Sequence, residues 1–445
     1  MKLTAEQKDS ARAILRSNDE SFLHLLRMAG LDPADVLPGA DLRGVVFTQD
    51  DDLTGLDFSR CDLRGTDLTQ ATRVEQAVFT DAICDATTRG MPQARPPANF
   101  DIEKVRDMIL RGEPPPSNWI PFISRLAFQG YADFCDLTPL GGLIALRELN
   151  LTGTRVTDLT PLARTSALQR LNLNRTGVKD LTPLAGISAL RRLDLTGTLV
   201  GDLAPLAGIS GLQRLDLTDT KVMDLTPLVG ISTLRELSLT GTWVTDLTPL
   251  AGSTALVGLN LNGTGVMDLT PLEGLSALQR INLNRTMVSD LTPLAGLSAI
   301  QRLNLNRTGV TDLTPLAGLS SLEWLNLNRT GVVVLAPLAD LSKLAWLNLN
   351  DTRVTVLAPL AGSSALQRLD LSGTGVTMLT PLAGLSSLQW LTLNGTGVTD
   401  LKPLAGLSRL RILDITHTEI TDIRPLQHLT NLKIVGYTSN QTDAR

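Results

Sequence analysis

The sequence is poor in aromatic residues and in histidine, and each shortage excludes a class of protein. Aromatic residues make up 3% of the 445 residues, whereas 43% are apolar, which favours a repetitive aliphatic core over a set of globular domains. The three histidines, His24, His417 and His428, are scattered, and no Gly-rich phosphate loop, zinc-ligand spacing or nucleophile elbow is present. We therefore expect no catalytic residues, no cofactor and no metal site, and we predict that the protein is not an enzyme.

Cysteines and long apolar runs are scarce as well. Cys61, Cys84 and Cys135 match no metal-ligand spacing, and their odd number supports no complete disulfide framework, which indicates a reducing compartment. The first residues are polar where a signal peptide would be apolar, and no segment has about 18 uninterrupted apolar residues. We expect a cytoplasmic protein, or an effector delivered without a cleaved signal peptide, and no membrane partner. The net charge of -5 makes general nucleic-acid binding an unfavoured function.

What the sequence has in abundance is one repeated unit. A proline returns every 22 residues from Pro139 to Pro425, and the phrase around it recurs, as in residues 300–321. We number the positions of each repeat from Leu146, the first residue of the first full repeat. Such a period is typical of a solenoid, in which each unit packs only on its neighbours.

The pattern inside each repeat predicts one strand and one turn. Apolar residues alternate at positions 4 and 6, as in Leu149 and Leu151, which is the period of a strand with one face in the core. Position 9 is threonine in every full repeat, and its hydroxyl is expected to bond backbone groups. At positions 15 and 16, Thr160 is expected to cap, and Pro161 to begin, a short helix or 3₁₀ turn. The recurring aspartate at position 13 is interpreted as a solvated carboxylate near that turn rather than as a calcium ligand.

This spacing resembles the 22-residue leucine-rich-repeat class known from bacterial internalins and from a eukaryotic phosphatase regulator. The resemblance covers residues 137–435 and implies an α/β solenoid: a leucine-rich-repeat horseshoe with a parallel concave sheet and short convex helices or 3₁₀ turns. Residues 436–445 are then a C-terminal tail.

A second period, of five residues, runs through residues 40–86. Phrases such as Ala-Asp-Leu-Arg-Gly at 40–44 and Cys-Asp-Leu-Arg-Gly at 61–65 resemble pentapeptide repeats, which implies about two coils of a four-sided right-handed β-helix. Its second run begins with an irregular Asp-Asp-Asp at residues 50–52. We interpret this segment as a structural element or a small interaction module.

The remaining N-terminal segments are interpreted as caps and a linker. Residues 1–39 form a helical cap, with helices expected over 4–16 and 19–29 that cover the open end of the β-helix. Residues 87–136 comprise a linker, a helix over 101–111 and the N-terminal cap of the solenoid, in whose core we place Trp119.

The candidate binding surface is the outward face of the strands, where side chains carry no expected role in the fold. Position 3 holds three of the five tryptophans, and repeats seven to nine add arginines at positions 3 and 8 with no acidic residue at positions 3, 5 or 8. Exposed tryptophan and arginine are enriched at binding hot spots. The candidate partner-binding residues are Arg280, Arg285, Arg302, Arg307, Trp324, Arg329, Trp346, Arg368 and Trp390. The alternative is drift between repeats, with solvated arginines.

A second anomaly lies at position 13, where Val334, Val356 and Met378 replace aspartate in three consecutive repeats. Either this apolar strip faces a partner or a second copy, or the side chains sink into local packing. The leading hypothesis is a non-enzymatic scaffold that binds a protein or peptide on its concave face. The alternatives are a binder of nucleic acid or another anionic polymer, and a regulatory subunit of an enzyme. Salt dependence separates the polymer from the protein.

Overall fold

The computed structural model describes residues 21–28, 30–79, 82–85, 87–91, 96–97 and 99–437. The chain divides into two compact units, Met1–Asn99 and Phe100–Arg445. The helix expected over residues 4–16 and all but the first two residues of the expected tail lie outside the described residues.

The first unit is a coil whose turns are held by parallel backbone bridges. Asp41 pairs with Asp62, and Asp62 pairs with Ile83, so that successive coils are about four pentapeptides apart. One apolar residue from each pentapeptide points inward, and these side chains form a separate core: Leu42, Phe47, Leu53, Phe58, Leu63 and Leu68. The helical elements among the described residues of this unit are α2 (Phe22–Met28), α3 (Pro33–Val36) and the 3₁₀ turn η1 (Val74–Gln76). The pentapeptide coil is confirmed.

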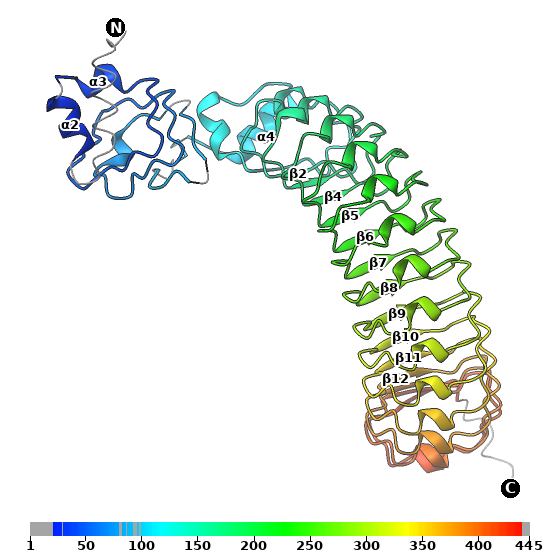
Figure 1. Ribbon diagram of the computed structural model, residues 1–445. Coiled ribbons are helices and arrows are strands. Elements are labelled where there is room, and N and C mark those ends of the chain that lie inside the picture. The colour runs from blue at the N-terminus through cyan, green and yellow to red at the C-terminus, as the bar shows by residue number, and fades with distance from the viewer. Residues whose placement is uncertain are drawn as a thin grey trace. The chain divides into compact units, whose positions relative to one another are not determined.

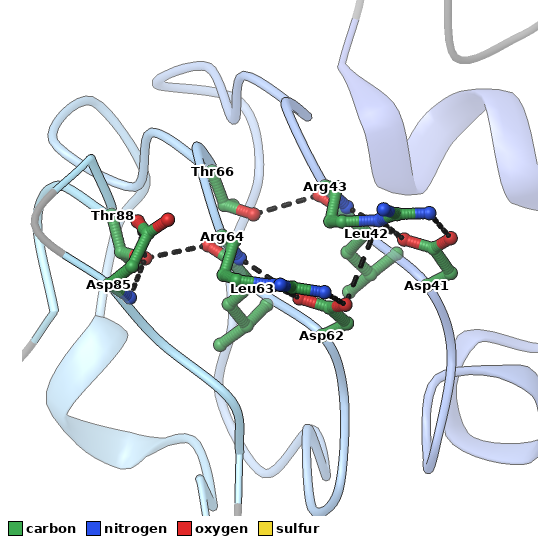
Figure 2. A network of polar contacts seen from close by, with 9 residues as sticks. All are labelled: Asp41, Leu42, Arg43, Asp62, Leu63, Arg64, Thr66, Asp85 and Thr88. Carbon is green, nitrogen blue, oxygen red and sulfur yellow. Dashed lines mark hydrogen bonds and ion pairs between the residues drawn. The ribbon is translucent and has the colours of Figure 1, made fainter.

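A ladder of polar contacts crosses the outer wall of this coil (Figure 2). The Arg43 guanidinium donates to both carboxylate oxygens of Asp41, at 2.8 and 2.7 Å, and Arg64 does the same to Asp62, at 2.9 and 2.6 Å. The hydrogen bonds from Arg43 lower the pKa of the Asp41 carboxyl to about 2. Beneath the ladder, the Thr66 hydroxyl donates to the Leu42 carbonyl of the preceding coil at 2.8 Å. Side chains as well as backbone bridges therefore tie one coil to the next.

The irregular aspartate run has a definite role in this unit. The Asp51 side chain is fully buried and accepts hydrogen bonds from the backbone N–H groups of Leu23 and Thr48, at 2.8 and 2.7 Å, and from the Ser21 hydroxyl at 2.7 Å. It thereby fixes the N-terminal end of α2 on the coil. The Phe22 ring packs edge-on against Phe47 at 5.2 Å between centroids, so the second predicted helix does cover the coil.

The second unit begins with a cap. Helix α4 (Ile102–Leu110) starts at Asp101, whose carboxylate accepts the Glu103 N–H at 2.9 Å. The 3₁₀ helix η2 (Ser117–Phe122) carries Trp119, which is 5% exposed and belongs to the solenoid core. The predicted helix and the predicted role of Trp119 in the cap core are both confirmed.

The cap leads into one parallel sheet of 15 strands among the described residues, stacked in chain order along one side of a curved array (Figure 1). Each repeat contributes three residues in identical register, so equivalent positions lie side by side. Strands β1 to β15 are Arg125–Ala127, Glu148–Asn150, Arg170–Asn172, Arg192–Asp194, Arg214–Asp216, Glu236–Ser238, Gly258–Asn260, Arg280–Asn282, Arg302–Asn304, Trp324–Asn326, Trp346–Asn348, Arg368–Asp370, Trp390–Thr392, Ile412–Asp414 and Lys433–Val435.

A short 3₁₀ turn follows each of the strands β1 to β14 and stands on the opposite side of the repeat. The turns η3 to η16 are Thr138–Leu140, Thr160–Arg164, Thr182–Leu184, Ala204–Leu206, Thr226–Leu228, Thr248–Leu250, Thr270–Leu272, Thr292–Leu294, Thr314–Leu316, Ala336–Leu338, Ala358–Leu360, Thr380–Leu382, Lys402–Leu404 and Arg424–Leu426. Leucines from strands and turns fill a continuous core between them. The leucine-rich-repeat solenoid is therefore confirmed.

The prediction that threonine caps these turns is wrong. No side-chain cap hydrogen bond comes from the residue that precedes η4, and Thr160 is already inside the turn. The cap is Asp158 at position 13, whose carboxylate accepts the Thr160 N–H at 2.8 Å. The threonine at position 9 does act as expected, because the Thr154 hydroxyl donates to the Leu151 carbonyl at 2.8 Å, and the bond recurs up to Thr418.

Candidate protein-binding surface

The concave face is organised by position 3, the first residue of each strand. Because the strands pair in register, Trp324 lies between Arg302 and Trp346, and Arg368 lies between Trp346 and Trp390. Arg280 lies beside Arg302 at the other end, so the structure brings six of the predicted site residues together in one row, one strand apart.

Two tryptophans in this row form a stacked pair. The indole rings of Trp324 and Trp346 have centroids 4.3 Å apart and an angle of 8° between their planes. Each ring covers one face of the other, and both residues remain partly exposed. Stacking of this kind contributes about 0.5–1.5 kcal/mol beyond area burial. The pair is a rigid apolar platform on a face that is otherwise polar.

The third tryptophan extends the platform through an arginine. The Arg368 guanidinium lies 5.6 Å from the centroid of the Trp390 ring, within the range of a cation–π contact. The Trp390 Nε1–H donates to the Thr392 hydroxyl at 3.1 Å, and the residue is 41% exposed. Trp346, Arg368 and Trp390 line a hollow of about 220 Å³.

A larger hollow of about 540 Å³ lies on the other side of the tryptophan pair. Its lining includes Arg280, Arg302 and Trp324, and it opens where Gly258 takes position 3 without a side chain. The Glu236 carboxylate occupies the space that a Cβ on Gly258 would need, and it pairs with Arg280 two repeats away. The hollow is therefore lined by both signs of charge.

The basic cluster is smaller than the sequence indicated. Repeats seven to nine carry no acid at positions 3, 5 or 8, but Glu236 pairs with Arg280, and Asp351 pairs with Arg329 at 3.1 Å. Glu236 lies in repeat five and Asp351 in repeat ten, so both acids come from outside repeats seven to nine. Arginine and glutamate side chains are long enough to reach across one or two strands. A count of charges within each repeat therefore does not show which charges are paired.

Three of the predicted arginines occupy the turn after the strand. Arg285, Arg307 and Arg329 at position 8 have φ values of 57°, 55° and 55°, in the left-handed region. Glycine holds this position in other repeats, as in Gly153 and Gly241. None of the three arginines lines either hollow beside the tryptophan pair. Position 8 therefore requires a left-handed backbone conformation. The expectation that outward side chains have no role in the fold does not hold at this position.

Position 5 also has a role in the fold. The Asn304 side chain accepts the Asn306 N–H at 3.1 Å, and the Asp194 and Asp370 carboxylates accept the corresponding N–H groups at 3.0 Å. The asparagine and aspartate residues of this column thus close the turn that follows each strand. Of positions 3, 5 and 8, only position 3 is therefore left without a role in the fold, and its residues are the best indicators of a binding site.

A third hollow, of about 600 Å³, was missed by the sequence analysis. It lies at the N-terminal end of the concave face, where α4 residues Ile102 and Arg106 meet the first strands, and Arg170, Arg192 and Arg214 also line it. The run of arginines at position 3 in repeats two to four was the available signal. Glu148 pairs with Arg125 and Arg170 at 3.3 and 2.8 Å, so this hollow too has mixed charge.

The apolar residues at position 13 are exposed. Val334, Val356 and Met378 are 60%, 60% and 68% exposed, which excludes the alternative that they sink into local packing. Each replaces an aspartate that caps the adjacent turn in other repeats, such as Asp312, whose carboxylate accepts the Thr314 N–H at 2.8 Å. Three repeats thus lose a hydrogen bond and gain an exposed apolar side chain.

Metal-binding side chains do not cluster in the described part of the chain. No group of three or more His, Cys, Asp or Glu side chains among them is placed to hold a metal ion. Cys61 is buried, Cys84 and Cys135 are exposed, and all three are free; burial raises the pKa of the Cys61 thiol. No helix in the described part of the chain is long and apolar enough to cross a bilayer.

Two family models match the chain: Leucine Rich repeats over residues 386–428, and Pentapeptide repeats over residues 52–83. No curated protein sequence matches it. The chain therefore carries leucine-rich repeats preceded by a pentapeptide-repeat segment.

Among solved structures it is similar to an internalin, inlF, from Listeria monocytogenes, with 28% identity, a TM-score of 0.66, and coverage of 72% of this chain and 94% of that one. It is also similar to a leucine-rich-repeat protein of Leptospira interrogans, with 19% identity, a TM-score of 0.63, and coverage of 73% and 93%. The plant peptide hormone receptor RGFR1, solved in complex with RGF2, shares 15% identity and a TM-score of 0.51, with coverage of 64% and 57%. The last two likenesses show the fold alone.

Proposed function

We propose that this protein is a non-enzymatic scaffold that binds a protein or peptide on the concave face of its solenoid. The observation that carries the proposal is the stacked Trp324–Trp346 pair with a hollow on either side. Large rigid aromatic side chains beside pockets of mixed polarity are the usual anchors of protein interfaces. The plant receptor RGFR1 has a similar fold and is complexed with RGF2, which agrees with a peptide as the bound species.

The contacts on this face favour a protein over an anionic polymer. Arg280 and Arg329 already pair with carboxylates, and each tryptophan of the pair has one ring face covered by the other. Single-stranded nucleic acid needs free arginines and ring faces on which bases stack. Regulation of an enzyme is a special case of the same proposal, in which the partner is the enzyme.

The test compares affinity capture by the wild type and by the double variant Trp324→Ala/Trp346→Ala, with the organism's own lysate as the source of partners. The captured protein is then titrated against both. We expect the double variant to bind at least about 2 kcal/mol more weakly, which is roughly a 30-fold rise in Kd. Its melting temperature is expected to fall only slightly, through the loss of the stacking contact. Ile144→Ala removes another exposed apolar side chain, 64% exposed, and is expected to bind like the wild type.

Two results would contradict the proposal. Undiminished capture by the double variant returns the tryptophans to drift between repeats. Capture that requires nucleic acid, and that falls by about a thousandfold between 50 and 200 mM salt, identifies a polyanion instead.

A further inference from the structure

A second apolar surface lies off the concave face, on the flank where each strand leads toward its 3₁₀ turn. Leu199, Met223, Trp243, Met267 and Met287 are 49%, 58%, 62%, 61% and 67% exposed. They occupy positions 10 and 12 of repeats three to seven. We call these five residues the Met/Trp strip.

The backbone brings position 10 of one repeat beside position 12 of the repeat before it. The Trp243 N–H donates to the Val222 carbonyl, next to Met223, and the Met287 N–H donates to the Val266 carbonyl, next to Met267, both at 3.1 Å. Met223 and Trp243 are therefore neighbours, as are Met267 and Met287. The strip consists of these two pairs, with Leu199 one repeat further toward the N-terminus.

The pairs replace a small side chain next to a glycine. In the pair Thr245–Gly265, a Cβ on the glycine would lie 2.8 Å from the threonine Cγ2, and in Thr311–Gly331 the same distance is 2.7 Å. A side chain at position 10 would thus be crowded by the threonine at position 12 in these two pairs. The methionines at position 12 are flexible enough to give way, so the large residues of each pair are sterically matched to each other.

A row of carboxylates borders the strip. Position 13 follows position 12 and holds aspartate in repeats three to seven: Asp202, Asp224, Asp246, Asp268 and Asp290. Threonine side-chain and backbone hydrogen bonds lower the pKa of Asp224, Asp246, Asp268 and Asp290, which keeps these carboxylates charged at neutral pH. Lys179 and Lys221 lie at the N-terminal end of the strip, since the Leu199 N–H donates to the Val178 carbonyl next to Lys179. Positions 10, 12 and 13 of repeats five to eight carry no lysine or arginine.

We propose that the Met/Trp strip binds an amphipathic helix of a partner protein, with the apolar face of the helix on the strip and basic residues along its edge facing the aspartate row. One helical turn rises 5.4 Å, close to the ~4.8 Å between neighbouring strands, so a helix along the strip offers about one side chain to each repeat. Adaptable methionine surfaces are suited to this mode of recognition. The site is separate from the proposed concave one.

The test measures fluorescence anisotropy of a labelled 14-residue peptide, with leucine at every third or fourth position and lysine elsewhere, on the full chain. A second peptide has glutamate in place of lysine. The strip variant, Met223→Thr/Trp243→Gly/Met267→Thr/Met287→Gly, introduces residues that other repeats carry at these positions. We expect the wild type to bind the lysine peptide at least ten times more tightly than the strip variant does, and more tightly than it binds the glutamate peptide.

Two further variants separate the contribution of the aspartate row from that of the concave site. Asp246→Asn/Asp268→Asn keeps an oxygen acceptor for the turn and removes charge, so it is expected to weaken binding of the lysine peptide several-fold without changing the fold. Trp324→Ala/Trp346→Ala leaves the strip intact and is expected to bind the peptide like the wild type, whatever becomes of the concave site.

Three outcomes would overturn the proposal. The first is that the strip variant and the Asp246→Asn/Asp268→Asn variant, both with normal circular dichroism, bind the lysine peptide as tightly as the wild type does. The second is equal affinity of the wild type for the two peptides. The third is that the wild type sediments as a dimer and the strip variant as a monomer. That result would mean that a second copy of the chain occupies the strip.

Discussion

Replacing Arg307 by glycine is expected to stabilise the protein. Arg307 has a φ of 55°, and the left-handed conformation costs a residue with a Cβ roughly 1–2 kcal/mol. Glycine removes that strain but increases the entropy of the unfolded chain, by about 0.4–1 kcal/mol. The difference predicts a net gain in the free energy of unfolding of about 1 kcal/mol.

The native backbone is compatible with this change. The Arg307 N–H donates to the Asn328 carbonyl of the next repeat at 2.8 Å, and Gly153 and Gly241 make the equivalent bond at the same length. The Arg307 side chain makes no hydrogen bond or ion pair with the described residues, whereas Arg329 would lose its contact with Asp351. At Arg307 the substitution therefore changes the backbone strain without removing a side-chain contact.

The assay is urea unfolding followed by far-ultraviolet circular dichroism, with two matched controls. Arg307→Ala keeps the Cβ and the strain, so its stability should match the wild type. Arg302→Gly lies in β9, where glycine is expected to cost roughly 0.5–1 kcal/mol. If Arg307→Gly is destabilised as much as Arg302→Gly, the argument from backbone strain is refuted. A stabilised Arg307→Gly that binds its partner less well would show that the strained arginines serve recognition.

Three other predictions concern the scaffold. Leu305→Ala, at a fully buried position, should lower the free energy of unfolding by about 2–5 kcal/mol. Thr308→Val loses only the hydrogen bond to the Leu305 carbonyl and should lower it by about 1 kcal/mol. Equal losses in denaturant titrations would contradict the assignment of the core. Because the pKa of Asp41 is depressed to about 2, its contribution to stability is complete above its unfolded value near 4 and is lost as the pH falls toward 2; thermal melts between pH 5 and 2 should show a smaller loss for Asp41→Asn than for the wild type. The fragment 100–445 corresponds to the second compact unit and should fold alone; an unfolded circular-dichroism spectrum would exclude independent units.

The repeat itself was predictable because its determinants are local and recur. The alternation of Leu149 and Leu151 predicts the strand, and the proline after each strand predicts the turn on the opposite side, since both depend on periodicity and on proline geometry. The row of tryptophans follows as well, because a fixed repeat length places equivalent positions side by side. The stacking of Trp324 on Trp346 is a consequence of that register.

Contacts between repeats were harder to predict. The reach of Glu236 across Gly258 to Arg280 depends on a gap in a neighbouring strand. The Met/Trp strip depends on a backbone hydrogen bond that places position 10 of one repeat beside position 12 of the repeat before it. Distances between side chains on different repeats depend on the packing of the whole stack rather than on the sequence of one unit.

The sequence by itself determined the solenoid, the pentapeptide coil and the column that holds the tryptophans, because a short period imposes one local structure repeatedly. Only the tertiary structure decided which outward positions are free. Position 5 closes a turn through its side chain, and position 8 adopts a left-handed backbone. Both requirements arise from how the chain leaves one strand while hydrogen bonded to the next, and the alternation of residues along a strand contains no information about that geometry.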